Sequence, residues 1–311
     1  MTPLRLGYLY GLGAYLLWGF FPLYFKLLRP AGPLEILAHR VVWSVAFVAL
    51  LLIALRNVGF LRALLRRPRT LAGIAAAATL IAVNWFTYIY GVNSDRVVET
   101  ALGYFINPLV VVLLGVLVLR ERLRRAQWLA LGVGATAVAV LAVDYGRLPY
   151  LALILAFSFG GYSLVKKRLG LPAAEGLFVE SAVLSLPALG YLGWLAATGE
   201  AAFGHVSAGH TALLVLAGAL TAIPLLLFAG AANRLPLTAL GMLQYVAPIL
   251  QLGCGVLIFH EPMPPARLAG FALVWLALIV FTGDAVRQAR HTRRLRPDGT
   301  VPATVAVASS R

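Results

Sequence analysis

The sequence predicts an all-α polytopic membrane protein with ten transmembrane helices, arranged as two inverted repeats of five helices each. Three observations lead to this prediction. Hydrophobic residues make up 61% of the 311-residue chain and charged residues only 12%, about half the charged fraction of soluble domains. Apolar runs of ~20 residues, each able to cross the ~30 Å hydrocarbon layer, follow one another along the chain. The second half also repeats polar residues of the first half at a nearly constant distance.

Each apolar run is expected to be a helix, because backbone groups in lipid must bond within their own segment. The expected spans are residues 7–28, 34–55, 71–92, 98–119, 127–143, 148–165, 176–197, 211–232, 238–259 and 267–284. The first run is too long for a secretory signal peptide and lacks a small-residue cleavage site. The short runs of alternating polarity that indicate a barrel are not seen in the sequence.

The repeat rests on polar residues, glycines and prolines, which match by chance far less often than leucines do in apolar helices. The pairs at an offset of 140 are Asn93 with Asn233, Pro108 with Pro248, Gly115 with Gly255, Glu121 with Glu261, Asp144 with Asp284, and Arg147 with Arg287; at 141, Gly19, Lys26 and Ser44 match Gly160, Lys167 and Ser185. The halves are residues 7–143 and 148–284. Since five is odd, the second half starts on the opposite side of the membrane, as in carriers that work by alternating access.

Basic residues account for the net charge of +15 and also orient the chain. They gather in the loops after spans two, four, six and eight, which is the positive-inside pattern. Both termini are therefore expected in the cytoplasm, with residues 285–311 as a flexible basic tail. Nucleic acid is not an expected partner, because the basic residues follow the membrane topology.

The sequence predicts no cofactor and no metal site. Cys254 is the only cysteine, which excludes a disulfide within the chain. The five histidines show no metal-ligand spacing. No P-loop, nucleophile elbow or other catalytic motif is present, so an enzyme is not predicted.

Span two carries the charged residues that most suggest function, because ionisable groups inside a bilayer are costly. Glu35, His39 and Trp43 share one helical face, and Arg40 lies beside them. A deep arginine is a natural partner for a carboxylate or phosphate on a solute. His39 is a candidate proton carrier, because imidazole titrates near neutral pH.

Span one presents Tyr15, Trp18, Pro22 and Lys26 on one face. The short linker to span two is expected to bring Lys26 close to Glu35 near the outer side. Two interpretations stay open for that pair. The pair binds the solute, or Lys26 extends outward and forms a structural ion pair with Glu35.

Span three carries Asn84, Trp85 and Tyr88 near its middle, and Asn93 follows. Buried amides either join helices or contact a ligand, and both interpretations stay open. Trp85 and Tyr88 are expected to line a cavity that stacks planar solutes, with simple core packing as the alternative.

Spans four and nine carry prolines at corresponding positions, Pro108 and Pro248. A proline frees a carbonyl and bends its helix, and matched breaks in two repeats often mark a transport site. Pro22 is a third expected kink. A purely structural bend is the competing account. The polar residues expected beside these prolines are Tyr104, Asn107, Gln244, Tyr245 and Gln251.

Glu180 lies about one turn into span seven and corresponds to His39 at the 141 offset. It is a second candidate for proton coupling. The alternative is a structural carboxylate paired with a basic residue of an inner loop.

Several short motifs carry a family resemblance. They are Trp18-Gly19 with Pro22, Tyr24 and Lys26; Glu35-Ile36 with His39-Arg40; Trp43-Ser44; Asn84-Trp85; Leu102-Gly103-Tyr104-Phe105-Ile106-Asn107-Pro108-Leu109; Gln127-Trp128; and Gln244-Tyr245 with Pro248. With ten spans in two repeats, residues 7–286 resemble the RarD subgroup of the EamA drug/metabolite transporters. The resemblance implies an inner-membrane carrier with a cavity between its halves, and a chloramphenicol-type phenotype. The basic tail and Gly160-Gly161 depart from the pattern.

The function expected from these observations is secondary transport, with export of a small metabolite or amphipathic drug by alternating access. The expected partners are a small-molecule solute and membrane lipid, and a second copy of the chain in a homodimer is also considered. A passive channel is one alternative, although the sequence has no clustered filter glycines or rings of like charge. A membrane receptor or scaffold without transport is the other.

Overall fold

The structure is a computed structural model that describes residues 2–54, 56, 59, 64, 67–120, 123–170 and 172–294. Throughout these residues the secondary structure is helical, without a strand, which confirms the predicted all-α class. The elements are α1 (Pro3–Gly19), α2 (Phe21–Leu27), α3 (Pro33–Ala54), α5 (Pro68–Asn93), α6 (Val97–Leu119), α7 (Arg125–Asp144), α8 (Tyr150–Leu169), α9 (Ala173–Thr198), α10 (Ala208–Ala232), α11 (Leu237–Leu243), α12 (Val246–Gly253), the π-helix η1 (Cys254–Ile258) and α13 (Pro265–Arg294).

Helices cover all ten stretches that the sequence marks as spans. In the described part of the chain, eight helices are long and apolar enough to cross a membrane, and α1 with α2 makes a ninth when the bent pair is one span. The apolar part of α8, Tyr150–Lys166, is shorter. The whole of α8 has 20 residues, which is roughly 30 Å of helix. α13 continues past Asp284 to Arg294, into the predicted tail, and residues 295–311 lie outside the described residues.

The first expected span is interrupted, which goes beyond the kink expected at Pro22. α1 and α2 meet at Phe20 with a bend of 42°. Pro22 has no N–H and cannot donate to the Trp18 carbonyl one turn earlier. That carbonyl instead accepts a hydrogen bond of 3.1 Å from the Gln251 Nε2 atom on α12. A polar side chain of the second half thus replaces the helix bond that proline removes.

Prolines do not locate helix breaks by themselves. The ninth expected span is divided near Tyr245, where α11 ends and α12 begins, and Pro248 follows this break. Pro108 lies inside α6, which is one continuous helix. Pro187 and Pro224 also lie inside continuous helices, α9 and α10. At Pro108, where a kink is expected, the helix is therefore not interrupted.

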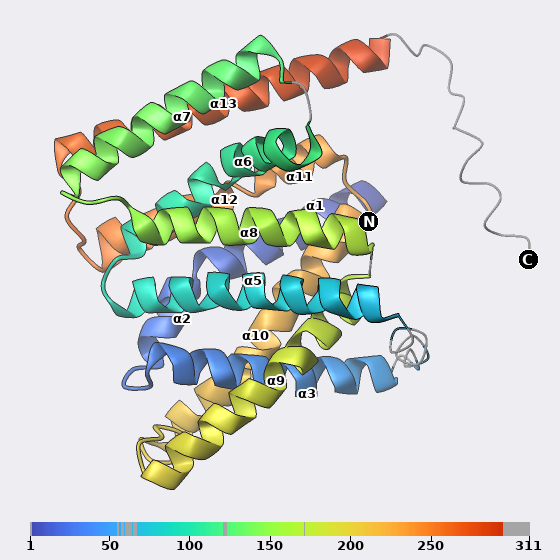
Figure 1. Cartoon of the computed structure of the whole chain (residues 1–311), viewed down its shortest axis with the longest axis vertical. Coiled ribbons are helices and arrows are strands. Elements are labelled where there is room, and N and C mark those ends of the chain that lie inside the picture. The colour runs from blue at the N-terminus through green and yellow to red at the C-terminus, as the bar shows by residue number, and fades with distance from the viewer. Residues whose placement is uncertain are drawn as a thin grey trace, which may run out of the picture.

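The helices form a bundle with a long pair at each side (Figure 1). α7 lies along α13 at one side, and α9 crosses α3 at the other. Between these pairs, α8 packs against α5 and α6, while α1 packs against α10 and α12. One hydrophobic cluster surrounds Phe25 and a second one surrounds Phe105 and Phe271.

α3 and α10 approach each other closely because Gly218 has no side chain. A Cβ atom at Gly218 would lie only 2.3 Å from the Trp43 carbonyl carbon. This approach matters for function, because α3 carries Arg40 and α10 carries Thr221.

Candidate functional site

Glu35, Glu99 and Glu261 lie at one end of the bundle, which we call the Glu99 end. It contains the loops at residues 28–32, 94–96, 145–149, 199–207 and 259–264. This end lies at the left in Figure 1, opposite the chain N-terminus.

Arg40 lies inside the bundle, about 10 Å along α3 from the Glu99 end at 1.5 Å per residue, and its side chain is only 5% exposed. Its Nε atom donates to the Thr221 hydroxyl at 2.7 Å. The guanidinium lies over the Trp85 ring, 4.1 Å from its centre, and 5.7 Å from the rings of Phe21 and Phe25. Three of the expected site elements, spans one to three, therefore meet at this arginine.

Three tyrosines lie close enough to act electrostatically on Arg40, namely Tyr24, Tyr88 and Tyr104. The Tyr24 hydroxyl donates to the Leu213 carbonyl at 2.6 Å. The Tyr88 ring contacts Tyr104, with ring centres 5.5 Å apart. The Tyr88 hydroxyl is buried and has no hydrogen-bond partner among the described residues. It is therefore an unused donor on a ring that packs against Phe25, which also contacts the guanidinium.

Asn84 joins helices, which is one of the two roles expected for it. Its Nδ2 atom donates to the Leu155 carbonyl at 2.9 Å and to Ser158 Oγ at 3.2 Å, and these bonds connect α5 to α8. Its Oδ1 atom accepts a longer bond of 3.4 Å from Tyr104. Other expected site amides retain a buried oxygen without a partner among the described residues: Asn93 Oδ1, Asn107 Oδ1 and Gln251 Oε1.

His39 is held as a neutral imidazole in this conformation. Trp43 Nε1 donates to His39 Nδ1 at 3.3 Å, and the imidazole stacks on Phe203 with ring centres 4.6 Å apart. An indole nitrogen can only donate, so Nδ1 must accept and cannot carry a proton. His39 Nε2 is buried without a partner in the described structure. Protonation of His39 therefore requires Trp43 to release it.

Lys26 and Glu35 do not pair with each other, so the structural ion pair considered for them is wrong. Lys26 pairs with Asp95 in the loop after α5. Glu35 accepts N–H groups of Ala202 and Phe203 at 2.8 and 3.2 Å. The short linker between α2 and α3 does bring Lys26 and Glu35 to the same end of the bundle. There Lys26 meets Asp95 of one later loop, and Glu35 meets backbone N–H groups of another.

Glu180 is paired with a lysine, as the structural alternative for it proposed. Lys166 Nζ lies 2.7 Å from Oε1, and the Tyr162 hydroxyl donates to Oε2 at 3.0 Å. The glutamate is 2% exposed. Its negative charge is therefore balanced in this conformation.

Glu99 is a buried carboxylate that the sequence interpretation missed. It is 2% exposed and lies 2.7 Å from Arg96 and 2.9 Å from Arg147. It also accepts the Leu151 N–H at 3.1 Å, which joins α6 to the start of α8. The signal was available, because Glu99 lies inside the expected span 98–119.

Glu261 caps a helix of the other half. Its carboxylate accepts the N–H groups of Val97 and Val98, the first residues of α6, at 2.5 and 2.8 Å. Burial raises the pKa of the Glu261 carboxyl, and these backbone bonds lower it by less. The sequence interpretation used Glu261 only as the repeat partner of Glu121, which lies outside the described residues.

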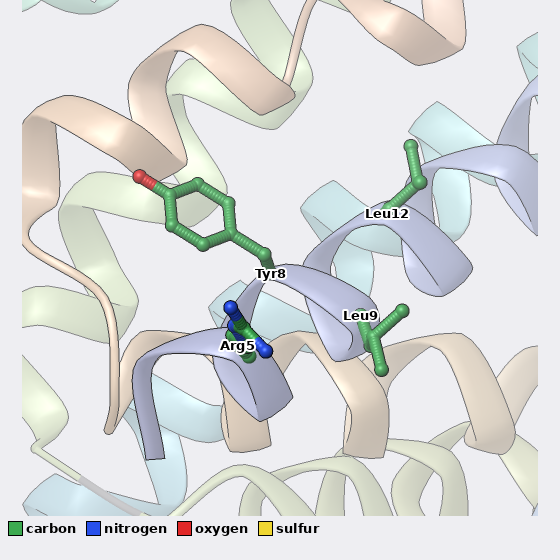
Figure 2. A pocket seen from close by; sticks show the side chains of 4 residues that line it. All are labelled: Arg5, Tyr8, Leu9 and Leu12. Atoms are coloured by element: carbon green, nitrogen blue, oxygen red, sulfur yellow. The ribbon is translucent and has the colours of Figure 1, made fainter. Parts of the chain in front are cut away.

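The remaining expected residues do not meet Arg40. Tyr245, next to Gln244, packs against the Phe105 cluster rather than the Phe25 cluster that contains the site. Two surface hollows are found among the described residues, and Arg40 lines neither of them. One, of about 390 Å³, is lined by Arg5, Tyr8, Leu9 and Leu12, all on the first turns of α1 (Figure 2). The other, of about 250 Å³, is apolar and lies between α3, α5 and α9.

Comparison with known proteins identifies the family. The model of the EamA-like transporter family matches residues 5–143. A solved structure described only as "Crystal structure of protein" has the same fold, with a TM-score of 0.56 and 22% identity over 91% of this chain and 98% of that one.

Curated relatives match the chain over nearly its whole length. "Protein RarD" of Streptomyces exfoliatus is 56% identical over 97% of this chain and 96% of that protein. "Uncharacterized transporter YojE" of Bacillus subtilis is 45% identical over 92% and 97%. "Chloramphenicol-sensitive protein RarD" of Pseudomonas aeruginosa is 31% identical over 93% and 97%. The chain is a membrane transporter that belongs to the RarD subgroup of the EamA-like family.

Proposed function

We propose that this transporter exports a small metabolite or amphipathic drug across the inner membrane by alternating access. In this proposal ten spans form two inverted repeats, with α1–α2 as the first span, α11–η1 as the ninth, and both termini in the cytoplasm. The chain accommodates the solute near Arg40, between the halves.

The pattern of helix contacts carries the proposal. When each span is exchanged with its repeat partner, the most extensive helix contacts either become a different observed contact or stay the same. α5 with α8 becomes α10 with α1, α6 with α8 becomes α12 with α1, and α3 with α10 becomes α9 with α5. The pairs α3 with α9, α6 with α12, and α7 with α13 are unchanged. Such a pattern is what a two-fold relation between inverted halves requires.

Contacts that the two-fold relation makes equivalent differ in extent. This difference supports a conformation that is closed at one end of the bundle only. α3 packs more extensively on α10 than α5 packs on α9. More polar bonds join the halves at the Glu99 end, namely Glu35 to Phe203, Glu99 to Leu151 and Glu261 to Val97, than at the opposite end, where Arg124 pairs with Asp284. The basic loops lie at the opposite end. We therefore infer an outward-closed conformation.

Proton coupling is a separate part of the proposal. Glu180 would exchange a proton when its bond to Lys166 opens, and His39 would do so after Trp43 releases Nδ1. Both residues lie on helices, α3 and α9, that form a symmetric pair. An imposed pH gradient that leaves the flux of reconstituted protein unaltered would remove both residues from this role.

The test is transport by purified protein in liposomes, with labelled chloramphenicol and a panel of small metabolites. A carrier gives saturable uptake and exchange with solute loaded on the other side. Ohmic single-channel currents would instead indicate a pore, and no flux of any panel member would indicate a receptor or scaffold. Reporter fusions at the two termini test the topology, and termini on opposite faces would exclude inverted five-span repeats.

A further inference from the structure

We propose that Arg40 and Tyr88 form a recognition site for one carboxylate group of the transported solute. This inference rests on the proposed transport function and adds the chemical class of the solute.

Charge balance is the first step. Arg40 is buried, yet none of the ion pairs among the described residues includes it. The buried acids within the described bundle are already engaged elsewhere: Glu35 binds a loop backbone, Glu99 binds two arginines, and Glu180 binds Lys166. A buried charge without a partner is strongly unfavourable. An anion from outside the chain would provide the missing charge.

The hydrogen bonds of Arg40 are also incomplete. Nε donates to Thr221, whose hydroxyl in turn donates to the Ala217 carbonyl at 2.8 Å, so Thr221 is a neutral partner. The Trp85 ring covers the flat face of the guanidinium at 4.1 Å. Neither terminal nitrogen of Arg40 donates to a described residue. Stacking on the face leaves the guanidinium edge free, and this edge binds carboxylates in a bidentate manner.

Tyr88 provides a further donor. Its ring packs against Phe25, with ring centres 5.9 Å apart, and Phe25 also contacts the Arg40 guanidinium. Its hydroxyl is buried and finds no partner in the described part of the chain, whereas the Tyr24 hydroxyl donates to the Leu213 carbonyl. An unsatisfied buried hydroxyl is unfavourable, and a carboxylate oxygen at Arg40 would satisfy it.

The site favours one negative charge over two. Arg40 offers a single positive charge without an acidic partner among the described residues, whereas Lys26 is engaged with Asp95 and Lys166 with Glu180. A phosphate dianion would leave a surplus charge in a low-dielectric setting. The aromatic rings around the guanidinium suit an apolar or planar body attached to the carboxylate.

The experiment compares matched carboxylates and amides, namely benzoate with benzamide, phenylacetate with phenylacetamide, and nicotinate with nicotinamide. Phenyl phosphate tests a dianion. Binding is measured as a thermal shift of the full-length protein, and transport as uptake into liposomes of phosphatidylcholine alone, which excludes an anionic lipid headgroup as the ligand. We expect at least one carboxylate, but not its amide, to bind and to be transported.

The variants are Arg40→Gln, Arg40→Lys and Tyr88→Phe, with Arg5→Gln as the matched control on the surface of α1. Loss of a hydrogen bond to a charged group predicts roughly 10- to 100-fold weaker carboxylate binding in Arg40→Gln. Tyr88→Phe is expected to show a smaller loss, Arg40→Lys to retain part of the affinity, and Arg5→Gln to retain all of it. Tyr88→Phe alone decides the test if Arg40→Gln is not monodisperse.

Three results would overturn the inference: equal binding of an amide and its carboxylate, unchanged carboxylate binding in Arg40→Gln or Tyr88→Phe, or no stabilisation by any carboxylate. Saturable transport of a neutral solute together with any of these results would leave the transport function intact. Absence of saturable transport of every solute would count against the proposed function instead.

Discussion

Removal of the Glu261 carboxylate should loosen the Glu99 end of the bundle. Glu261 accepts two N–H groups at the start of α6, at 2.5 and 2.8 Å, and thereby connects the η1–α13 loop to the other half. In Glu261→Ala both donors lose their acceptor. The two halves then have one fewer connection at this end.

The size of the effect follows from these two bonds. Loss of a helix cap costs about 1 kcal/mol, and a buried unsatisfied donor costs about 1–3 kcal/mol. Burial raises the pKa of Glu261, so the charged carboxylate loses favourable hydration in the closed state, and its partial exposure screens the charge. This offset leaves a net loss of about 1–2 kcal/mol, or about 5- to 30-fold in the closed-to-open equilibrium.

Hydrogen exchange of the peptide that contains Val97 and Val98 measures this equilibrium directly. Exchange should be about 5- to 30-fold faster in Glu261→Ala than in the native protein at pH 7. Glu261→Gln should retain most of the protection, because a raised carboxyl pKa means that the neutral form is well tolerated. Glu200→Ala is the matched control, since Glu200 is an exposed glutamate at the same end.

The sign of the pH dependence is fixed by the same shift. A carboxyl whose pKa is raised on closure favours the closed state below the ordinary carboxyl pKa, and this contribution is lost as the pH rises through the raised value. Protection of residues 97 and 98, corrected for intrinsic exchange rates, should therefore increase in the native protein as the pH falls from 7 to the ordinary carboxyl pKa, and not in Glu261→Gln. Unchanged protection in Glu261→Ala would refute the reasoning.

Further predictions concern packing, pH and flux. Gly218→Ala places a methyl group against the Trp43 backbone and should lower stability by about 1–3 kcal/mol in thermal melts, whereas Gly283→Ala, with open space around it, should not. A hydrogen bond from Lys26 lowers the pKa of Asp95, so its contribution to stability holds above the ordinary carboxyl pKa and is lost as the pH falls through the lowered value. Asp95 is 65% exposed, so melts of Asp95→Asn should show a loss of only ~0.5 kcal/mol at pH 7. Because the empty carrier holds an unbalanced arginine, exchange of a transported carboxylate should be faster than its net efflux, and equal rates would contradict this expectation.

The sequence predicted the helices well because burial in lipid leaves few alternatives for a long apolar run. The expected span 34–55 corresponds to Pro33–Ala54, and the expected span 98–119 to Val97–Leu119. The break at Phe20 was not predicted as such. Pro22 signalled a bend, but similar prolines inside α9 and α10 leave their helices continuous. Whether a helix breaks depends on what else can bond to the freed carbonyl, which a local sequence pattern does not contain.

The site was predicted in part. The sequence interpretation selected Arg40 on span two and Trp85 on span three as site residues, and the Arg40 guanidinium does lie over the Trp85 ring. Thr221 was missed, because a threonine in an apolar helix has no distinctive pattern. The partner of Lys26 was also missed, since Asp95 lies in a loop far along the sequence. Contacts between distant segments depend on the packing of the whole bundle, and one sequence without its fold does not specify them.

The interruption of α1 and α2 is located next to the other interrupted helix of the bundle. α1 contacts both α11 and α12, whereas the repeat partners of these spans, α8 and α6, are continuous and contact each other. Under the proposed two-fold relation, the interface of α1 with α11 and α12 is built from interrupted helices, whereas the equivalent interface of α8 with α6 is built from continuous ones. In the proposed alternating-access cycle, straightening at the interrupted interface would accompany bending at the continuous one, and access to the solute would pass from one face of the membrane to the other.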